Sequence, residues 1–254
     1  MAPVVHSITN YVVMNTTANA LLAIGASPVM AHAEEEMAEM VAIASSLVIN
    51  IGTLSPAWIR SMFLAAEHAQ DRGIPIVLDP VGAGATTYRT RTARELIRKA
   101  RPSIIRGNAS EILAVCGDDA HGQGRTKGVD SLDASSTAVA AARSLHEAYG
   151  SMVCISGATD YIVGGSSLIQ VHNGHPMMTR VTGLGCTATA LCGAFAAVEA
   201  DPGLAAAKAM VVMGIAGEIA AGKAEGPGTL QLHFLDALFA LTRQDVEARI
   251  RVEA

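Results

Sequence analysis

The sequence predicts an α/β fold in which a mostly parallel sheet is covered by helices on both faces. Two observations lead to this prediction. Short runs rich in β-branched residues recur along the chain, and segments of helical length rich in Ala, Leu and Glu lie between them. The alternation continues without a linker-like stretch across the 254 residues. Residues 1–254 are therefore expected to form a single domain.

The expected strands follow from the apolar, β-branched runs, taken in chain order. They are SPVMA at 27–31, LVINIG at 47–52, PIVLDPVG at 75–82, SIIRGN at 103–108 and MVCISG at 152–157. The helices expected between them occupy 16–24, 34–45, 56–72, 90–100, 109–115 and 134–148. Because the runs are apolar throughout, they are typical of central strands buried on both faces.

The remaining segments complete the expected fold. SSLIQVHNGH at 166–175 predicts a further strand, antiparallel and at one edge of the sheet. Segment 117–131 carries four glycines and mixed charge, which predicts a mobile surface loop. From residue 185 the chain is expected to be helical as far as 223, with another helix from 235. The uncharged run 181–198 reaches membrane-span length, but its glycines and threonines favour a buried helix.

Composition limits the classes of function. Half of the residues are apolar and only 16% are charged, too little charge to cover a monomer, so a homo-oligomer is expected. The net charge of −5, without a run of Lys or Arg, argues against nucleic acid and membranes and favours a small-molecule substrate. The start MAPVVHSITN lacks the pattern of a secretory signal, and the four cysteines form no CxxC pair. A cytoplasmic protein with reduced thiols is expected.

Polar residues follow several expected strands, and ligands bind at those carboxyl ends in open α/β sheets. Asp79 follows PIVL, the stretch from Arg106 to Glu111 follows SII, and Ser156 follows MVCI. Taken alone, Asp79 can cap a turn, and Asn108 with Glu111 can form the capping box of a helix. Together, two carboxylates suited to Mg²⁺, a cationic arginine and a glycine-rich helix start indicate phosphoryl transfer.

That helix start is the stretch RVTGLGCTATALCGAF at 180–195. Its simplest interpretation is a tight turn followed by helix-packing glycines. Gly183 and Gly185 also allow backbone N–H groups to approach a ligand, and the positive end of a helix beginning near Cys186 would stabilise a transferring phosphate. The helix end favours the thiolate of Cys186, the one reactive candidate among the cysteines. This thiol can act as a nucleophile, or accept or orient the proton of a substrate hydroxyl.

With these residues in view, the chain resembles the hydroxyethylthiazole kinase family, thiamine-salvage enzymes of the ribokinase-like fold. The similarity covers nearly the whole chain. The motifs that carry it are HSITNYV from residue 6, GASPVMAHAEEEM from 25, INIGTL from 49, VLDPVGAGATTYR from 77, IRGNASEI from 105, GVDS from 128, NGHPMMTRVTGLGC from 173 and EGPGTLQLHFLDAL from 225.

The resemblance implies a ribokinase-like three-layer αβα fold with a mostly parallel central sheet. It also implies ATP- and Mg²⁺-dependent phosphorylation of the primary hydroxyl of 4-methyl-5-(2-hydroxyethyl)thiazole in thiamine biosynthesis or salvage. Family members are homotrimers whose active sites lie between subunits, and the low charge content agrees with that assembly.

The resemblance further assigns roles by position. Arg106 and Ser156 would contact ATP, together with Gly185 of the glycine turn. The residues expected to contact the thiazole are Met30, Gly183 and Asn10. Those expected to organise Mg²⁺ and its waters are Asp79 and Glu111, and Cys186 falls where most ribokinase-like enzymes carry an aspartate base.

Three alternatives stay open from the sequence. The chain can be a ribokinase-like kinase of another small alcohol, such as hydroxymethylpyrimidine or a sugar. A catalytically idle protein that binds a thiazole or a nucleotide would keep the same glycines. A hydrolase with Cys186 as its nucleophile is the third.

Overall fold

The structure is a computed structural model that describes residues 2–117 and 131–254. Within these residues nine strands form one sheet, in the order β2-β1-β3-β4-β5-β6-β7-β8-β9. The strands are β1 (Val4–Ile8), β2 (Ser27–Val29), β3 (Ser46–Asn50), β4 (Ile76–Asp79), β5 (Ile104–Asn108), β6 (Met152–Ser156), β7 (Asp160–Val163), β8 (Leu168–Val171) and β9 (Val252–Glu253). Strands β1 to β6 are parallel, and β7, β8 and β9 join antiparallel, which confirms the mostly parallel sheet.

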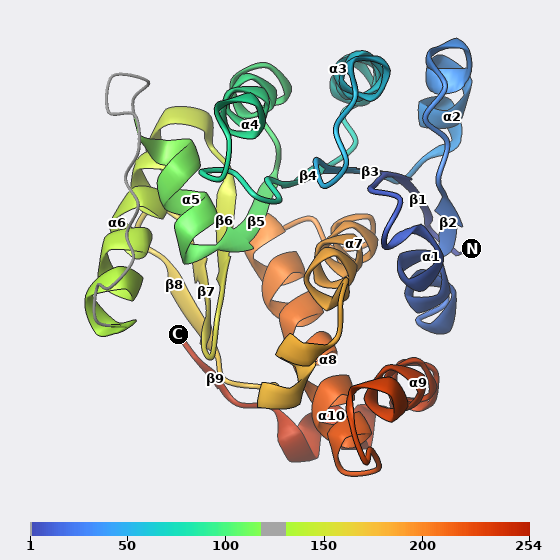
Figure 1. The fold of residues 1–254 in the computed structure, drawn as a ribbon, viewed down its shortest axis with the longest axis vertical. Coiled ribbons are helices and arrows are strands. Elements are labelled where there is room, and N and C mark those ends of the chain that lie inside the picture. The colour runs from blue at the N-terminus through green and yellow to red at the C-terminus, as the bar shows by residue number, and fades with distance from the viewer. Residues whose placement is uncertain (1, 118–130) are drawn as a thin grey trace.

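Helices cover both faces of this sheet (Figure 1). The α-helices are α1 (Met14–Ala23), α2 (Met37–Ile43), α3 (Pro56–Arg72), α4 (Thr87–Ala100), α5 (Ala109–Cys116), α6 (Ser131–Tyr149), α7 (Leu184–Ala196), α8 (Pro202–Ala221), α9 (Pro227–Ala240) and α10 (Arg243–Arg249). Two short 3₁₀ turns, η1 (Glu34–Glu36) and η2 (Pro176–Arg180), precede α2 and α7. Helices α1, α7, α8 and α9 build the hydrophobic core on one face, and α2 to α6 build the other. The predicted layers of helix, sheet and helix are thus confirmed.

Several elements differ from the sequence prediction. Strand β1 was not expected, because VVHSI places the polar His6 and Ser7 inside the fold, where both are fully buried. The predicted antiparallel strand at 166–175 is β8, but the edge of the sheet is β9, which pairs with its outer side. The expected loop at 117–131 falls almost wholly outside the described residues.

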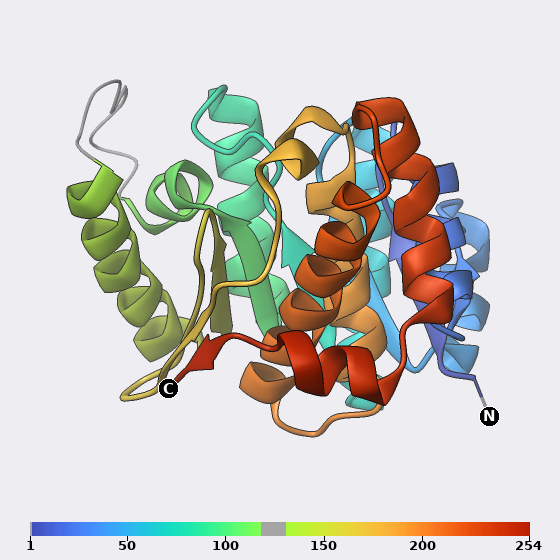
Figure 2. The same ribbon diagram turned by 90° about the horizontal axis from the view of Figure 1, so that it is seen from below.

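The long helical region after the glycine turn is two helices. Helix α8 begins at Pro202, and the side chain of Asp201 accepts hydrogen bonds from the first-turn N–H groups of Gly203 and Leu204. Such a cap and proline start a new helix, so the chain breaks between α7 and α8. Among the described residues α8 alone is long and apolar enough to cross a membrane, and most of its surface is buried inside the protein. Figure 2, seen from below, shows α8 and α9 side by side in front of the sheet.

Candidate active site

The carboxyl ends of the parallel strands bring three polar side chains together. Asn50 ends β3, Asp79 ends β4, and the two residues pair across the strands. Arg106 is the third residue of β5, the next strand of the sheet. In each strand, the residue two positions before the polar residue belongs to the hydrophobic core beneath α7 and α8. Side chains two positions apart in a strand point to the same face, so all three polar side chains point toward α7.

Asp79 lies at the centre of this group and is 2% exposed. Its Oδ2 accepts hydrogen bonds from Asn50 Nδ2 at 2.9 Å and from the hydroxyl of Thr189 on α7 at 2.7 Å. Burial raises the pKa of Asp79 to about 6, against the opposing charge of Arg106, and the nearby charge of Glu111 adds to the rise. A cation placed beside this carboxylate would stabilise its ionised form.

Arg106 supplies a buried positive charge beside Asp79. Its Nε is buried and has no hydrogen-bond partner among the described residues. A Cβ on Gly185 would lie 3.1 Å from Nη1 of this arginine, so the start of α7 rests against the guanidinium. An unpaired buried donor at the mouth of a site is a group that a ligand oxygen can satisfy.

The start of α7 provides a second set of donors. Gly183 is the N-cap with a φ of 87°, and a Cβ there would come within 2.7 Å of Val13 Cγ1. The helix therefore begins at Leu184, close to the start near Cys186 that the sequence predicts, and Cys186 is its third residue. The first intrahelical bond runs from Thr187 N–H to the carbonyl of Gly183. The three preceding N–H groups are left to point at a ligand, as a helix start that binds anions requires.

Cys186 is partly buried at this helix start, and Asn10 Nδ2 donates to its Sγ at 3.5 Å. Burial raises the pKa of the Cys186 thiol, and the negative charge of Asp79 raises it further. Burial and the charge of Asp79 thus oppose the stabilisation of a thiolate that the helix end offers. Cys154 and Cys192 are fully buried.

Glu111 connects two loops of the site. Its Oε1 accepts the N–H of Gly82 at 2.8 Å, and its Oε2 accepts the N–H of Asn108 at 2.9 Å. Asn108 in turn accepts the N–H of Glu111, which completes the capping box expected from the sequence. The carboxylate thereby fixes the loop after β4 against the start of α5.

The oxygen donors of this edge suit a hard divalent cation. In the described residues no three His, Cys, Asp or Glu side chains form a ready metal cluster. Asp79 and Glu111 are nevertheless close enough for the charge of one to raise the pKa of the other. Two carboxylates with few protein ligands fit Mg²⁺, which keeps several waters and binds substrate phosphates.

The other predicted residues lie at varying distances from this centre. Asn10 follows β1 and is 4% exposed beside Cys186. Ser156 ends β6 opposite Asn108, and its hydroxyl donates to the carbonyl of Gly107 at 3.4 Å. Met30 follows β2 and packs against the hydrophobic core that includes Leu184, without a hydrogen bond to the group.

The sequence prediction missed Asn50 and Thr189. Asn50 ends the run LVIN, so it carried the same strand-end signal as Asp79. Thr189 stands three residues after Cys186, the spacing that places two side chains on one side of a helix. Both could have been found by asking which nearby side chains could donate hydrogen bonds to a buried carboxylate.

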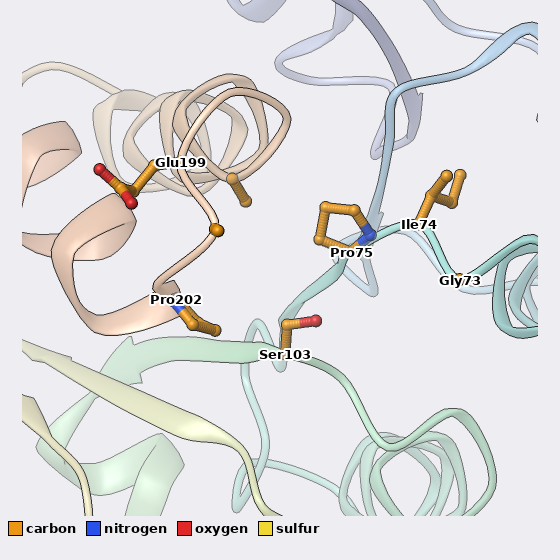
Figure 3. Close-up of a pocket in the computed structure, with 8 residues that line it drawn as sticks. Gly73, Ile74, Pro75, Ser103, Glu199 and Pro202 are labelled. Carbon is orange, nitrogen blue, oxygen red and sulfur yellow. The ribbon is translucent and has the colours of Figure 1, made fainter.

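A separate hollow of about 390 Å³ lies at the opposite ends of the strands (Figure 3). Pro75 and Ser103, which precede β4 and β5, line it together with Glu199, which follows α7, and Pro202, which begins α8. None of the polar residues described above borders it. Its position at the amino ends of the strands separates it from the start of α7.

Comparison with known proteins gives the family. The sequence pattern of the hydroxyethylthiazole kinase family matches residues 1–244. A hydroxyethylthiazole kinase of Syntrophus aciditrophicus (strain SB) is 64% identical over 253 residues, which cover 100% of this chain and 93% of the relative. Another, from Vibrio parahaemolyticus serotype O3:K6 (strain RIMD 2210633), is 55% identical over 99% of this chain and 93% of its own length.

Solved structures agree. The hydroxyethylthiazole kinase of Pyrococcus horikoshii OT3 has a TM-score of 0.90 and 43% identity, and covers 99% of this chain and 93% of its own. The pyridoxal kinase of Staphylococcus aureus in complex with AMP-PCP and pyridoxal has a TM-score of 0.64 at 14% identity, over 86% and 89% of the two chains, and shares the fold alone. The ribokinase-like fold is thereby confirmed. By the extent of the family match and the identity of its relatives, the chain belongs to the hydroxyethylthiazole kinase family and is a kinase.

Proposed function

We propose that the protein transfers the γ-phosphoryl group of ATP to the primary hydroxyl of 4-methyl-5-(2-hydroxyethyl)thiazole. The observation that carries this proposal is the start of α7, where unpaired N–H groups, the Arg106 guanidinium and the Cys186 thiol meet above Asp79. Phosphoryl transfer is catalysed mainly by positioning and by stabilisation of charge on the transferring group. A helix terminus beside a buried cation offers both.

ATP would lie along this carboxyl edge, with its phosphates toward Gly185 and Arg106. The unpaired Nε of Arg106 supports this placement, because a phosphate oxygen would complete its hydrogen bonding. Ser156 ends the next strand at the same edge and would contact the nucleotide farther from the reacting group.

Mg²⁺ would be held by Asp79 and Glu111 through oxygen and water. The metal supplies neutralisation of phosphate charge when it is bound. Glu111 keeps both carboxylate oxygens engaged with backbone N–H groups, so the protein fixes this ligand before any cation arrives.

Cys186 would position the substrate hydroxyl as a neutral thiol. Its raised pKa keeps it protonated near neutral pH, so it is a poor base at rest. A loose transition state needs little proton removal before transfer, so a thiol that orients the hydroxyl is sufficient. Met30, Gly183 and Asn10 would surround the thiazole. Of these three residues, Asn10 lies nearest to the Cys186 sulfur.

Exposed apolar side chains support an assembly. Tyr11 and Val12 are 66% and 65% exposed immediately after Asn10, and Leu22, Leu232 and Phe239 extend an apolar surface over α1 and α9. A second copy that covers this surface would reach the substrate side of the site, as in a homotrimer with sites between subunits. We propose the same cytoplasmic setting as the sequence suggested, with residues 1–254 acting as one domain.

The test is ADP release by the purified protein with ATP, comparing hydroxyethylthiazole, hydroxymethylpyrimidine and ribose, each with and without EDTA. Release that depends on the thiazole and is abolished by EDTA is the expected result. Release with one of the other alcohols would identify the protein as a ribokinase-like kinase of that alcohol. Thiazole binding without turnover would support an idle binding protein, and ester cleavage without ATP would support the cysteine hydrolase.

A further inference from the structure

A chain of hydrogen bonds runs from the buried carboxylate to the cysteine through two asparagines. Asn50 Nδ2 donates to Asp79 Oδ2 at 2.9 Å, and Asn50 Oδ1 accepts Asn10 Nδ2 at 2.8 Å. The same Asn10 nitrogen lies 3.5 Å from Cys186 Sγ. Asn50 is 1% exposed, and its side chain also forms a hydrogen bond with the Cys186 thiol.

The ionised carboxylate determines the direction of every bond in this chain. A carboxylate only accepts, so Asn50 must turn its NH₂ group toward Asp79 and its carbonyl away. That carbonyl accepts from Gly52 N–H at 2.9 Å as well as from Asn10. Asn10 must therefore direct its own NH₂ inward and toward the sulfur, while its Oδ1 accepts Val12 N–H at 3.1 Å. Neither amide can flip without placing two acceptors or two donors face to face.

Gly52 shapes the same position by its lack of a side chain. A Cβ at this residue would stand 2.5 to 2.7 Å from three side-chain atoms of Asn10. The backbone of Gly52 is itself held, since its carbonyl accepts Arg89 Nη2 at 2.6 Å. Asn10 therefore occupies a slot with a polar wall, Asn50, and a steric wall, Gly52.

We propose that Asn50 and Gly52 are positioning residues, which fix the Asn10 amide so that it holds Cys186 and the substrate hydroxyl in register for phosphoryl transfer. This inference rests on the proposed function and extends it to two residues that do not themselves touch the reacting atoms. Asn50 acts by orientation, through Asn10 and through its own hydrogen bond with Cys186. Gly52 acts by space, through Asn10.

A double-mutant cycle tests the route of action. Asn50→Ala and Asn10→Ala are each expected to lower kcat/KM for the thiazole by about tenfold, and the loss in the double variant should be smaller than the product of the two single losses. The KM for ATP should change less than about twofold in all three. Thiazole affinity without ATP, measured by calorimetry, should show the same coupling.

Thr189→Val is the matched control. It removes the other donor to the same Asp79 oxygen but leaves both asparagines paired. Its effect on kcat/KM should add to that of Asn10→Ala. If Asn50→Ala also adds to Asn10→Ala, then Asn50 serves only Asp79, and the proposal is overturned.

Gly52→Ala tests the steric wall and covers the case in which Asn50→Ala does not fold. It changes no polar group, and its collision partner is the Asn10 side chain. One of the three atoms in its way is the Asn10 Cβ, which alanine would keep, so the loss of thiazole affinity should vanish on an Asn10→Gly background, where all three atoms are absent. A loss that persists there would contradict the proposal. The assay of the parent protein tests the proposed kinase activity separately. Its result, turnover of the thiazole by the parent, does not depend on the outcome of the double-mutant cycles.

Discussion

Gly183 shows how much of this site depends on a single backbone conformation. Its φ of 87° lies in the left-handed region, which disfavours side chains, and a Cβ would also press on Val13. We expect Gly183→Ala to lower the free energy of unfolding by about 1–3 kcal/mol and to weaken ATP binding, because the start of α7 must shift. Chemical denaturation and nucleotide titration measure the two effects.

Gly228→Ala is the control for this substitution. Gly228 lies in the first turn of α9, and a Cβ there meets no atom within 4 Å. It should leave both stability and ATP affinity close to those of the parent. Equal losses in the two variants would mean that glycine content, and not the turn, sets the effect.

Cys186 gives a second prediction at this scale. Cys186→Asp should keep activity, because a carboxylate can take over the proton-handling place, and Cys186→Ala should lower kcat/KM by about tenfold, less than the roughly hundredfold loss typical of a removed general base. Steady-state ADP release measures both, with Cys116→Ala on α5 as the control. An alanine variant at position 186 as fast as the parent would remove the cysteine from the mechanism.

Asp160 predicts a pH dependence of stability. The residue is 7% exposed, and burial raises its pKa to about 6 although it accepts Gly157 N–H and faces the charge of Arg106. In the unfolded chain it ionises near its ordinary value of 3.8. Between these values the unfolded state holds fewer protons, so stability falls as pH rises from about 4 to about 6, by about 3 kcal/mol for this residue.

Asp160→Asn isolates that contribution, since an amide oxygen can still accept from Gly157. The difference in unfolding free energy between pH 4 and pH 7 should shift by about 2–3 kcal/mol relative to the parent. Denaturant titrations at the two pH values give the number. The same difference in both proteins would show that Asp160 ionises freely in the fold.

The sequence identified the charged residues of the site better than the neutral ones. Asp79 ends β4, Arg106 lies in β5, and Glu111 lies in the first turn of the helix that follows β5. Because the carboxyl ends of parallel strands meet at one edge of the sheet, the proximity of these residues could be predicted. In the sequence, Asn50 and Thr189 look like ordinary turn and helix residues. Their role becomes apparent only because the buried carboxylate needs hydrogen-bond donors. The ionisation of Cys186 depends on the balance of burial and helix terminus, which only packing decides.

At the scale of elements, the segment before α7 lies on one face of α8. Asn173 packs where Gly214 has no side chain, and Met178 packs where Gly217 has none. Glu218, the next residue of that face, accepts Gly174 N–H at 2.8 Å, Asn173 Nδ2 at 3.1 Å and Arg251 Nη2 at 2.6 Å. Helix α8 therefore fixes the approach of the chain to the glycine turn.

We expect Glu218→Ala to reduce stability by about 1–3 kcal/mol, since it removes three hydrogen bonds and leaves Gly174 N–H without its acceptor. The matched control is Glu247→Ala. Its ion pair with Arg243 has the same 2.6 Å length but is exposed, so it should change stability by less than about 0.5 kcal/mol. Melting curves compare them, and equal shifts would refute the special role of Glu218.

Element boundaries followed from the sequence where local chemistry was decisive. Helix α3 spans its predicted residues 56–72, because Ser55 caps it, Pro56 begins it and Gly73 ends it with a φ of 66°. Strands β7 and β9 could not be predicted, since four and two residues carry no periodicity. Their pairing depends on partners distant in the sequence.

At the scale of the whole molecule, the apolar surface over α1 and α9 predicts the assembly. In sedimentation, the parent should have three times the 26.1 kDa mass of the chain. Leu22→Glu with Leu232→Glu should dissociate it, because burial of a charge without a partner opposes association. Val198→Glu, an equally exposed apolar site on the turn after α7, should leave the mass unchanged. A parent protein that sediments at the mass of one chain would contradict the proposed trimer.

The position of β9 bears on how this protein is made. Strand β8 pairs on one side with β7, its hairpin neighbour, and on the other with residues 252 and 253, which follow every helix. During synthesis β8 thus keeps a bare edge while α7 to α10 emerge from the ribosome, and bare edges invite pairing between nascent chains. Strand β9 covers this edge only after those helices have been made, so a chain that stops before residue 252 would have most of its core and an open β8 edge prone to aggregate.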